Sequence, residues 1–133
     1  MIYDDGTAPF TNTTLSGMAQ SVVGVLRNPP ATANAFVRVR SVQTCQNELL
    51  AAFERATGAK WDVRRSTTEE LLASGRRKKE AGDKSWVADL VVAQLYAGEG
   101  RSVVAPAWEE SESPLLGVVE ESVDDIVAKA LEA

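Results

Sequence analysis

Four aromatic side chains could form a pocket for a small apolar ligand: Phe10, Trp86, Tyr96 and Trp108. Aromatic rings give such a pocket its walls, and a tyrosine hydroxyl adds one polar contact. The same residues also have a structural interpretation, because aromatic side chains spaced along a helix more often fill the core. The substrate pocket is therefore a hypothesis that depends on where the four rings lie.

The chain holds one cysteine, Cys45, and no histidine. A single thiol cannot form an internal disulfide or a multi-cysteine zinc site, and without histidine there is no Ser-His-Asp triad or Cys-His pair. Any catalysis by this chain would fall to carboxylates, lysines or tyrosines. Cys45 could have an activated thiol near a helix N-terminus, but a small buried packing residue is the commoner case.

Two charged clusters resemble binding sites. The basic run Arg76 to Lys79 could bind phosphate, but the glutamates on both sides of it are typical of a solvated helix face. Glu109, Glu110 and Glu112 lack the alternating ligand spacing of a calcium site. We therefore expect no catalytic residue and no metal site in these clusters.

Charge and hydropathy limit the partners of the protein. Residues 81–133 carry 3 basic and 11 acidic side chains, within a chain of net charge −5. Such an acidic half would repel phosphates, so we expect no nucleic acid partner. No apolar run approaches the ~18 residues that span a membrane, and no signal peptide pattern opens the chain. We therefore expect a cytoplasmic protein.

Periodicity predicts an α/β fold with a short parallel β-α-β unit and about five helices. Residues 2–3 end a strand, Thr13 or Thr14 caps a helix over 15–26, and the prolines after Asn28 stop it. Strands over 35–40 and 60–65 flank a helix over 44–57, so a right-handed parallel crossover joins them.

The second half reads as mainly helical. A capping box, Thr67 with Glu70, opens a third helix, and a fourth covers residues 86–97. Residues 75–84 read as a loop or a solvated helix end, residues 100–114 as irregular, and Ser122 with Asp125 caps the last helix. We expect one unit over 1–133, divided into a β/α part, 1–72, and a helical part, 73–133.

Five short motifs occur in order along the first part of the chain. They are Asp5-Gly6, Asn28-Pro29, Asn34, Gln46-Asn47-Glu48-Leu49 and Gly58-x-Lys60. Together they resemble the distal part of the isoflavone reductase-like and NmrA-like family, whose members are atypical short-chain dehydrogenases with a Rossmann-type, doubly wound dinucleotide-binding fold. The resemblance covers roughly residues 2–72 and continues more weakly to the end.

The resemblance implies the C-terminal, substrate-side portion of such a protein. In the family the Gln46 motif lies behind the cofactor-binding half, whereas here it starts 45 residues after Met1. The glycine-rich loop and the lysine for proton transfer have no counterpart in this chain. A full-length parent would use NADP(H) on a small aromatic or carbonyl substrate. The chain alone is expected to bind no cofactor and to be inactive.

Four motif residues have an architectural interpretation. Glu48 and Asn47 stand at a helix start, where a carboxylate favours the positive end of the helix dipole and an amide bonds nearby backbone. Gly58 suits a helix C-cap. Asn34 belongs to the connection before the next strand.

Two other functions stay open. Without its other half, the chain would expose apolar surface on the helix over 15–26 and the strand over 35–40. It could then be an interaction module that self-associates as a homo-oligomer or binds the missing N-terminal half. A weaker alternative is a small-ligand-binding protein that uses Trp86 and Tyr96.

Overall fold

The computed structural model of the protein describes residues 1–98 and 101–132, and it is α/β as expected. Contacts group the chain into two compact units. Unit 1 consists of Met1–Phe10 and Cys45–Ser102, and unit 2 consists of Thr11–Thr44 and the residues from Val103 on. Five of the described α-helices have ten residues or more, which agrees with the expected number. The expected boundary at residue 72 falls inside a helix, and the organisation of residues 1–133 as a single unit stays a prediction.

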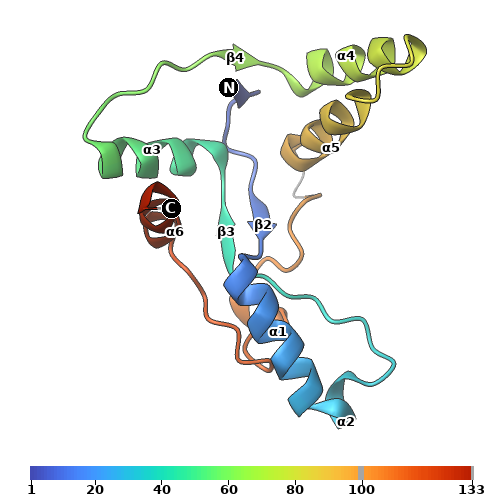
Figure 1. Cartoon of the computed structure of the whole chain (residues 1–133), viewed down its shortest axis with the longest axis vertical. Coiled ribbons are helices and arrows are strands. Elements are labelled where there is room, and N and C mark those ends of the chain that lie inside the picture. Colours follow the sequence, from blue (N-terminus) through green and yellow to red (C-terminus); the bar gives the residue numbers. More distant parts are fainter. Residues whose placement is uncertain (99–100, 133) are drawn as a thin grey trace. The chain divides into compact units, whose positions relative to one another are not determined.

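Unit 1 holds a short parallel sheet and three helices. Strand β1 (Ile2–Tyr3) pairs with β4 (Arg65–Ser66), so that Ile2 lies opposite Arg65 and Tyr3 opposite Ser66. Helix α3 (Gln46–Thr57) precedes β4 in the chain and contacts β1. Helices α4 (Thr68–Glu80) and α5 (Trp86–Tyr96) fold back on each other as a hairpin (Figure 1).

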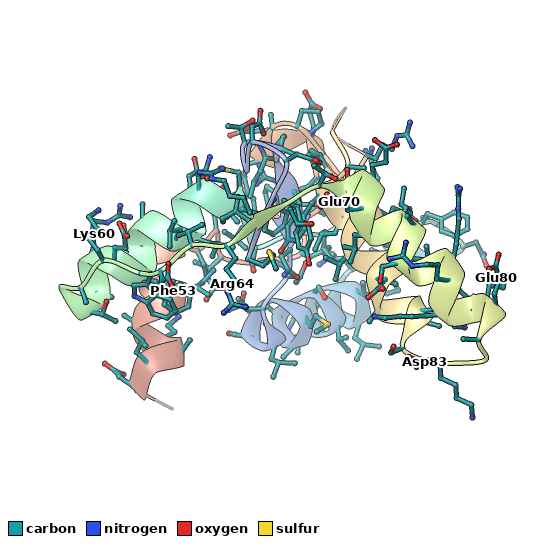
Figure 2. All side chains as sticks on the ribbon, turned by 90° about the horizontal axis from the view of Figure 1, so that it is seen from above. Phe53, Lys60, Arg64, Glu70, Glu80 and Asp83 are labelled. Atoms are coloured by element: carbon teal, nitrogen blue, oxygen red, sulfur yellow. The ribbon has the colours of Figure 1, made fainter. Side chains whose placement is uncertain are left out.

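Local capping residues fix the helices of unit 1. The Glu48 carboxylate accepts a hydrogen bond from the Cys45 N–H at 3.2 Å, and Gly58 ends α3 with a φ of 67°. At the start of α4 the Thr67 hydroxyl accepts from the Glu70 N–H at 3.1 Å, which confirms the capping box. Figure 2 shows Glu70 at the start of α4 and Glu80 at its end, so much of the expected loop or solvated helix end is helical.

Unit 2 contains the second pair of strands and the remaining helices. Strand β2 (Phe10–Asn12), whose first residue belongs to unit 1, pairs with β3 (Val42–Thr44). The helices are α1 (Leu15–Arg27), α2 (Pro29–Thr32) and α6 (Val123–Glu132), with a 3₁₀ turn at Trp108–Glu110.

The capping predictions for unit 2 are confirmed. The Thr14 hydroxyl accepts from the Gly17 N–H at 3.1 Å, and the Ser122 hydroxyl accepts from the Asp125 N–H at 3.1 Å. Helix α1 ends at Arg27, with Asn28 as its C-cap, before the prolines as expected. The prolines that follow open α2, because proline suits the first positions of a helix.

The strand predictions over 35–40 and 60–65 are wrong. The strands in these regions are β3 and β4, which start later, and the parallel pair is β1 with β4. Side chains, together with the Glu112 N–H, which donates to the Arg38 carbonyl at 2.9 Å, bind the backbone of the first segment in place of a neighbouring strand. The Arg38 N–H donates to Glu112 at 2.7 Å, and the Arg40 N–H donates to the Ser113 hydroxyl at 2.9 Å. A β-favouring sequence needs an adjacent strand to become one.

Candidate functional site

Three aromatic rings of unit 1 form one cluster. Tyr3 stacks on Tyr96 with ring centroids 5.8 Å apart and an interplanar angle of 19°. Phe10, which is only 4% exposed, meets the Tyr96 ring edge-on at 5.5 Å and 74°. Two of the predicted pocket residues, Phe10 and Tyr96, are therefore brought together, and the third ring is a residue that the sequence-based hypothesis does not include.

A pocket of about 260 Å³ lies against Tyr96. Its walls come from β1, α3, the segment after α3 and the end of α5, and all belong to unit 1. The volume is slightly smaller than the roughly 300–1,000 Å³ of pockets for drug-sized ligands. It suits a small, mainly apolar ligand. The lining residues are Met1, Ile2, Gln46, Leu49, Leu50, Phe53, Trp61, Asp62, Val63 and Tyr96.

Gln46 fixes the wall between α3 and β1. Its side-chain oxygen accepts from the Tyr3 N–H at 2.9 Å, and its side-chain nitrogen donates to the Tyr3 carbonyl at 3.1 Å. The residue is buried, so both polar groups of its amide are satisfied by the backbone of one residue. This pair of bonds positions Tyr3 beneath the Tyr96 ring.

Trp61 lines the pocket beside α3. Its ring centroid lies 5.2 Å from that of Phe53, and its indole N–H donates to Thr57 at 3.2 Å. Figure 2 shows Phe53 on α3 and Lys60 in the segment that follows the helix. Glu54 holds this segment, since its carboxylate accepts from Lys60 at 2.5 Å and from the Trp61 N–H at 3.2 Å. The hydrogen bond from Lys60, and then the one from Trp61, lowers the pKa of Glu54.

Tyr96 brings the pocket a weakly acidic hydroxyl. Burial raises the pKa of Tyr96 above the ordinary 10.0, and neighbouring Tyr3 adds a smaller contribution in the same direction. The phenol is therefore neutral at physiological pH, where it can donate or accept a hydrogen bond but cannot act as a phenolate base.

The other two predicted pocket residues lie elsewhere. Trp86 starts α5 and Tyr96 ends it, which separates them by roughly 15 Å along the helix axis. The Lys79 ammonium lies 5.1 Å from the Trp86 ring centroid, so a cation covers that ring. Trp108 belongs to unit 2, where the Arg40 guanidinium lies 5.4 Å from its ring centroid.

The motif residues have structural contacts. The Asn47 side chain donates to the Asp5 carbonyl at 2.9 Å, and the Asn47 N–H donates to the Gly6 carbonyl at 3.1 Å. Asn34 has a φ of 57°, a left-handed conformation that asparagine tolerates better than most residues. Together with the capping contacts of Glu48 and Gly58, these placements agree with an architectural interpretation.

Two side chains at the pocket could exchange a proton. The groups that could exchange a proton at the pocket are the Tyr96 hydroxyl and the carboxylate of Asp62, which is exposed. Within residues 1–98 and 101–132 no group of acidic and cysteine side chains could hold a metal ion. None of the described helices combines the length and the apolar character needed to cross a membrane.

Several pocket residues escape prediction from sequence. Gln46 is visible in its motif, but its role depends on Tyr3, which lies 43 positions earlier. The residues around Trp61 predict a strand. Its contact with Phe53 on α3 depends on the turn at Gly58, which brings the chain back along the helix. A possible signal is the pair of aromatics Phe53 and Trp61, which flank a helix C-cap.

Comparison with known proteins finds two curated relatives that are named as oxidoreductases. The chain is 57% identical over 133 residues to "Oxidoreductase poxI" of Penicillium oxalicum, which covers 99% of this chain and 42% of that protein. The protein of the same name from strain 114-2 matches to the same extent. The chain therefore spans less than half the length of these curated relatives. No protein-family model and no solved structure matches it.

Proposed function

We propose that this chain is the substrate-side part of a longer NAD(P)-dependent oxidoreductase of the NmrA-like or isoflavone reductase-like type. The observation that carries the proposal is the 57% identity to an oxidoreductase over 99% of the chain. The coverage of only 42% of that relative supports the view that the chain provides one part of the working protein. The five motifs in the first 72 residues support the choice of family.

In this proposal the pocket at Tyr96 holds the substrate. Its walls are aromatic and aliphatic, which favours a small aromatic or carbonyl compound over a charged one. The Tyr96 hydroxyl is neutral and can donate a hydrogen bond to a carbonyl oxygen of the substrate. Gln46 acts through Tyr3, because its amide is fully used in holding the β1 backbone.

The glycines nearest the N-terminus do not fit a dinucleotide. A pyrophosphate needs a glycine-rich turn at a helix start, where backbone N–H groups are open to it. Gly17 and Gly24 lie inside α1 and pack against Ser41 and Leu116, and the space beside Gly6 is filled by Asn47, 2.5 Å from a Cβ built there. We therefore assign binding of NADP(H) to the rest of the longer protein.

The test compares the isolated chain with a chimera in which it replaces the matching part of poxI. NADPH is titrated against both proteins and followed by fluorescence, and oxidation of NADPH is measured with a panel of aromatic carbonyl compounds. The chimera should bind and oxidise NADPH, and the isolated chain should do neither. Tight NADPH binding by the isolated chain would contradict the proposal.

Substitutions in the chimera test the role of the pocket. Tyr96→Ala should raise KM for the carbonyl substrate about 10-fold or more while NADPH binding stays the same, because a wall of the pocket is lost. Trp86→Ala is the matched control, since Trp86 lies at the other end of α5. Equal effects of both substitutions on KM would place the substrate elsewhere.

A second candidate function is supported by the composition of the pocket. All of its walls belong to unit 1, so a small apolar ligand could bind to the chain without another part. An environment-sensitive dye such as anilinonaphthalene sulfonate should then bind to the isolated chain, and Tyr96→Ala should weaken the binding. An unchanged dye signal in that variant would remove this candidate.

A further inference from the structure

Helix α1 packs against the rest of unit 2 through its glycines. Gly17 and Gly24 are the buried residues of the helix. A Cβ at Gly24 would lie 2.2 Å from the Leu116 carbonyl oxygen, and one at Gly17 would lie 3.0 Å from the Ser41 Cβ. The backbone of α1 therefore approaches its neighbours closely, and its large side chains lie away from this contact.

Those large side chains form an exposed apolar stripe. Leu15 is 82% exposed, Val22 59% and Leu26 75%, and Met18 lies between them at helical spacing. This is the stripe that periodicity detects in the sequence, and it faces outward instead of into unit 2. A helix that turns glycines inward and leucines outward has the reverse of the usual burial pattern.

A groove within unit 2 continues the stripe beyond α1. It has a volume of about 280 Å³ and is lined mainly by Val22, Val25, Leu26, Val37, Val39 and Leu116. Phe36, next to Val37 in the chain, is fully exposed. Stripe and groove together form an apolar surface that we call the α1 face: Leu15, Met18, Val22 and Leu26 with the groove. Contiguous apolar surface of this kind marks an interaction site.

The charge of α1 indicates the chemistry of its partner. Among residues 15–27 the charged side chain is Arg27, at the very end of the helix. A helix that faces water normally carries charged residues on its outer side. The α1 face therefore suits an apolar protein surface, and it offers little to a charged peptide or a phosphate.

We propose that the α1 face docks the remaining part of the longer oxidoreductase polypeptide. The inference rests on the proposed function in so far as the chain is one part of a longer protein. The choice of this partner for the α1 face follows from the length of the relative. The match covers 42% of poxI and leaves more than half of that protein outside it. A part of that size provides a large apolar partner surface within the same polypeptide.

The first experiment measures complex formation in trans. The part of poxI outside the match is co-expressed with this chain, and mass and affinity are measured by light scattering and titration. We expect a one-to-one complex that Val22→Glu and Leu26→Glu weaken by about 10-fold or more, since each puts a charge into an apolar contact. Val91→Glu is the matched control, because Val91 is 61% exposed on α5 in unit 1.

The second experiment covers the case in which the other part does not fold alone. Leu26→Glu is placed in the isolated chain and in the chimera with poxI, and the melting temperature of each is measured. The substitution should leave the isolated chain unchanged and lower the melting temperature of the chimera by several degrees. Equal shifts in both proteins would overturn the proposal.

Two further outcomes would also overturn it. One is a dimer of the isolated chain that Val22→Glu dissociates, because a second copy would then be the occupant. The other is a complex that tolerates both α1 substitutions. NADPH oxidation is measured separately, so a chimera that docks through α1 but lacks activity would contradict the proposed function and leave the docking intact.

Discussion

The Thr14 hydroxyl joins the first turn of α1 to Glu121, 107 positions later in the chain. It donates a hydrogen bond to the Glu121 carboxylate and accepts one from the Gly17 N–H at 3.1 Å. Lys129 binds the other oxygen of Glu121 at 3.1 Å, and the Glu121 N–H donates to the Ser41 carbonyl at 2.7 Å. This network ties the cap of α1 to the segment that leads into α6, all within unit 2.

Loss of this hydroxyl should destabilise the protein. Thr14→Val keeps the shape of the side chain but removes the helix cap and the bond to Glu121. We expect the free energy of unfolding, measured in urea, to fall by about 1–2 kcal/mol. Thr13→Val is the matched control, because the Thr13 hydroxyl makes one longer bond, 3.3 Å to the Val39 carbonyl. An equal loss in both variants would count against a special role of Thr14.

The same network predicts a pH dependence. The hydrogen bond from Thr14 lowers the pKa of Glu121 below the ordinary 4.5, burial opposes it, and Lys129 adds to the lowering. A depressed pKa in the folded state stabilises the protein above pH 4.5, and this contribution is lost as the pH falls through the folded pKa. The stability difference between the native protein and Thr14→Val should therefore be smaller at pH 3 than at pH 7. Urea midpoints at both pH values check this, and a constant difference would refute it.

Gly24→Ala should disrupt the packing of α1. The new methyl group would meet the Leu116 backbone at 2.2 Å, and neither backbone can move without distorting the other. We expect a loss of about 1–3 kcal/mol in the free energy of unfolding. Gly98→Ala is the control, because a Cβ there meets nothing within 4 Å. A stable Gly24→Ala protein would mean that α1 is not seated as described.

The raised pKa of Tyr96 can be measured directly. The chain has two tyrosines, so Tyr3→Phe leaves Tyr96 as the one phenol that ionises. Its absorbance at high pH should report a midpoint above 10.0 in the folded protein, because burial disfavours the phenolate. In urea the midpoint should return to the ordinary value. A folded variant that titrates at 10.0 would show that Tyr96 is open to water.

Helix ends and the strand at residues 2–3 could be predicted from the sequence, whereas the strands predicted over 35–40 and 60–65 could not. The caps at Thr14, Thr67, Gly58 and Ser122 depend on residues three or four positions away, so local patterns contain them. The segment 35–40 depends on Glu112 and Ser113, which lie 74 and 73 positions from their partners. No local pattern shows that side chains from so far along the chain replace a neighbouring strand.

The candidate site was partly predictable for the same reason. Phe10 and Tyr96 stand out as large aromatics, but their contact and the part played by Tyr3 depend on how β1 and α5 are placed in unit 1. Trp86 is also a large aromatic residue, so the sequence cannot separate it from the residues at the pocket. Only the bounds of α5 show that it lies one helix length away from Tyr96.

Each compact unit is built from two stretches of the chain that are far apart in sequence. Unit 1 needs Met1–Phe10 as well as Cys45–Ser102, and unit 2 needs Thr11–Thr44 as well as the residues from Val103 on. During synthesis on the ribosome neither unit can close when its first stretch emerges, since the complementary stretch is still untranslated. Each unit can therefore close only after its second stretch has been synthesised.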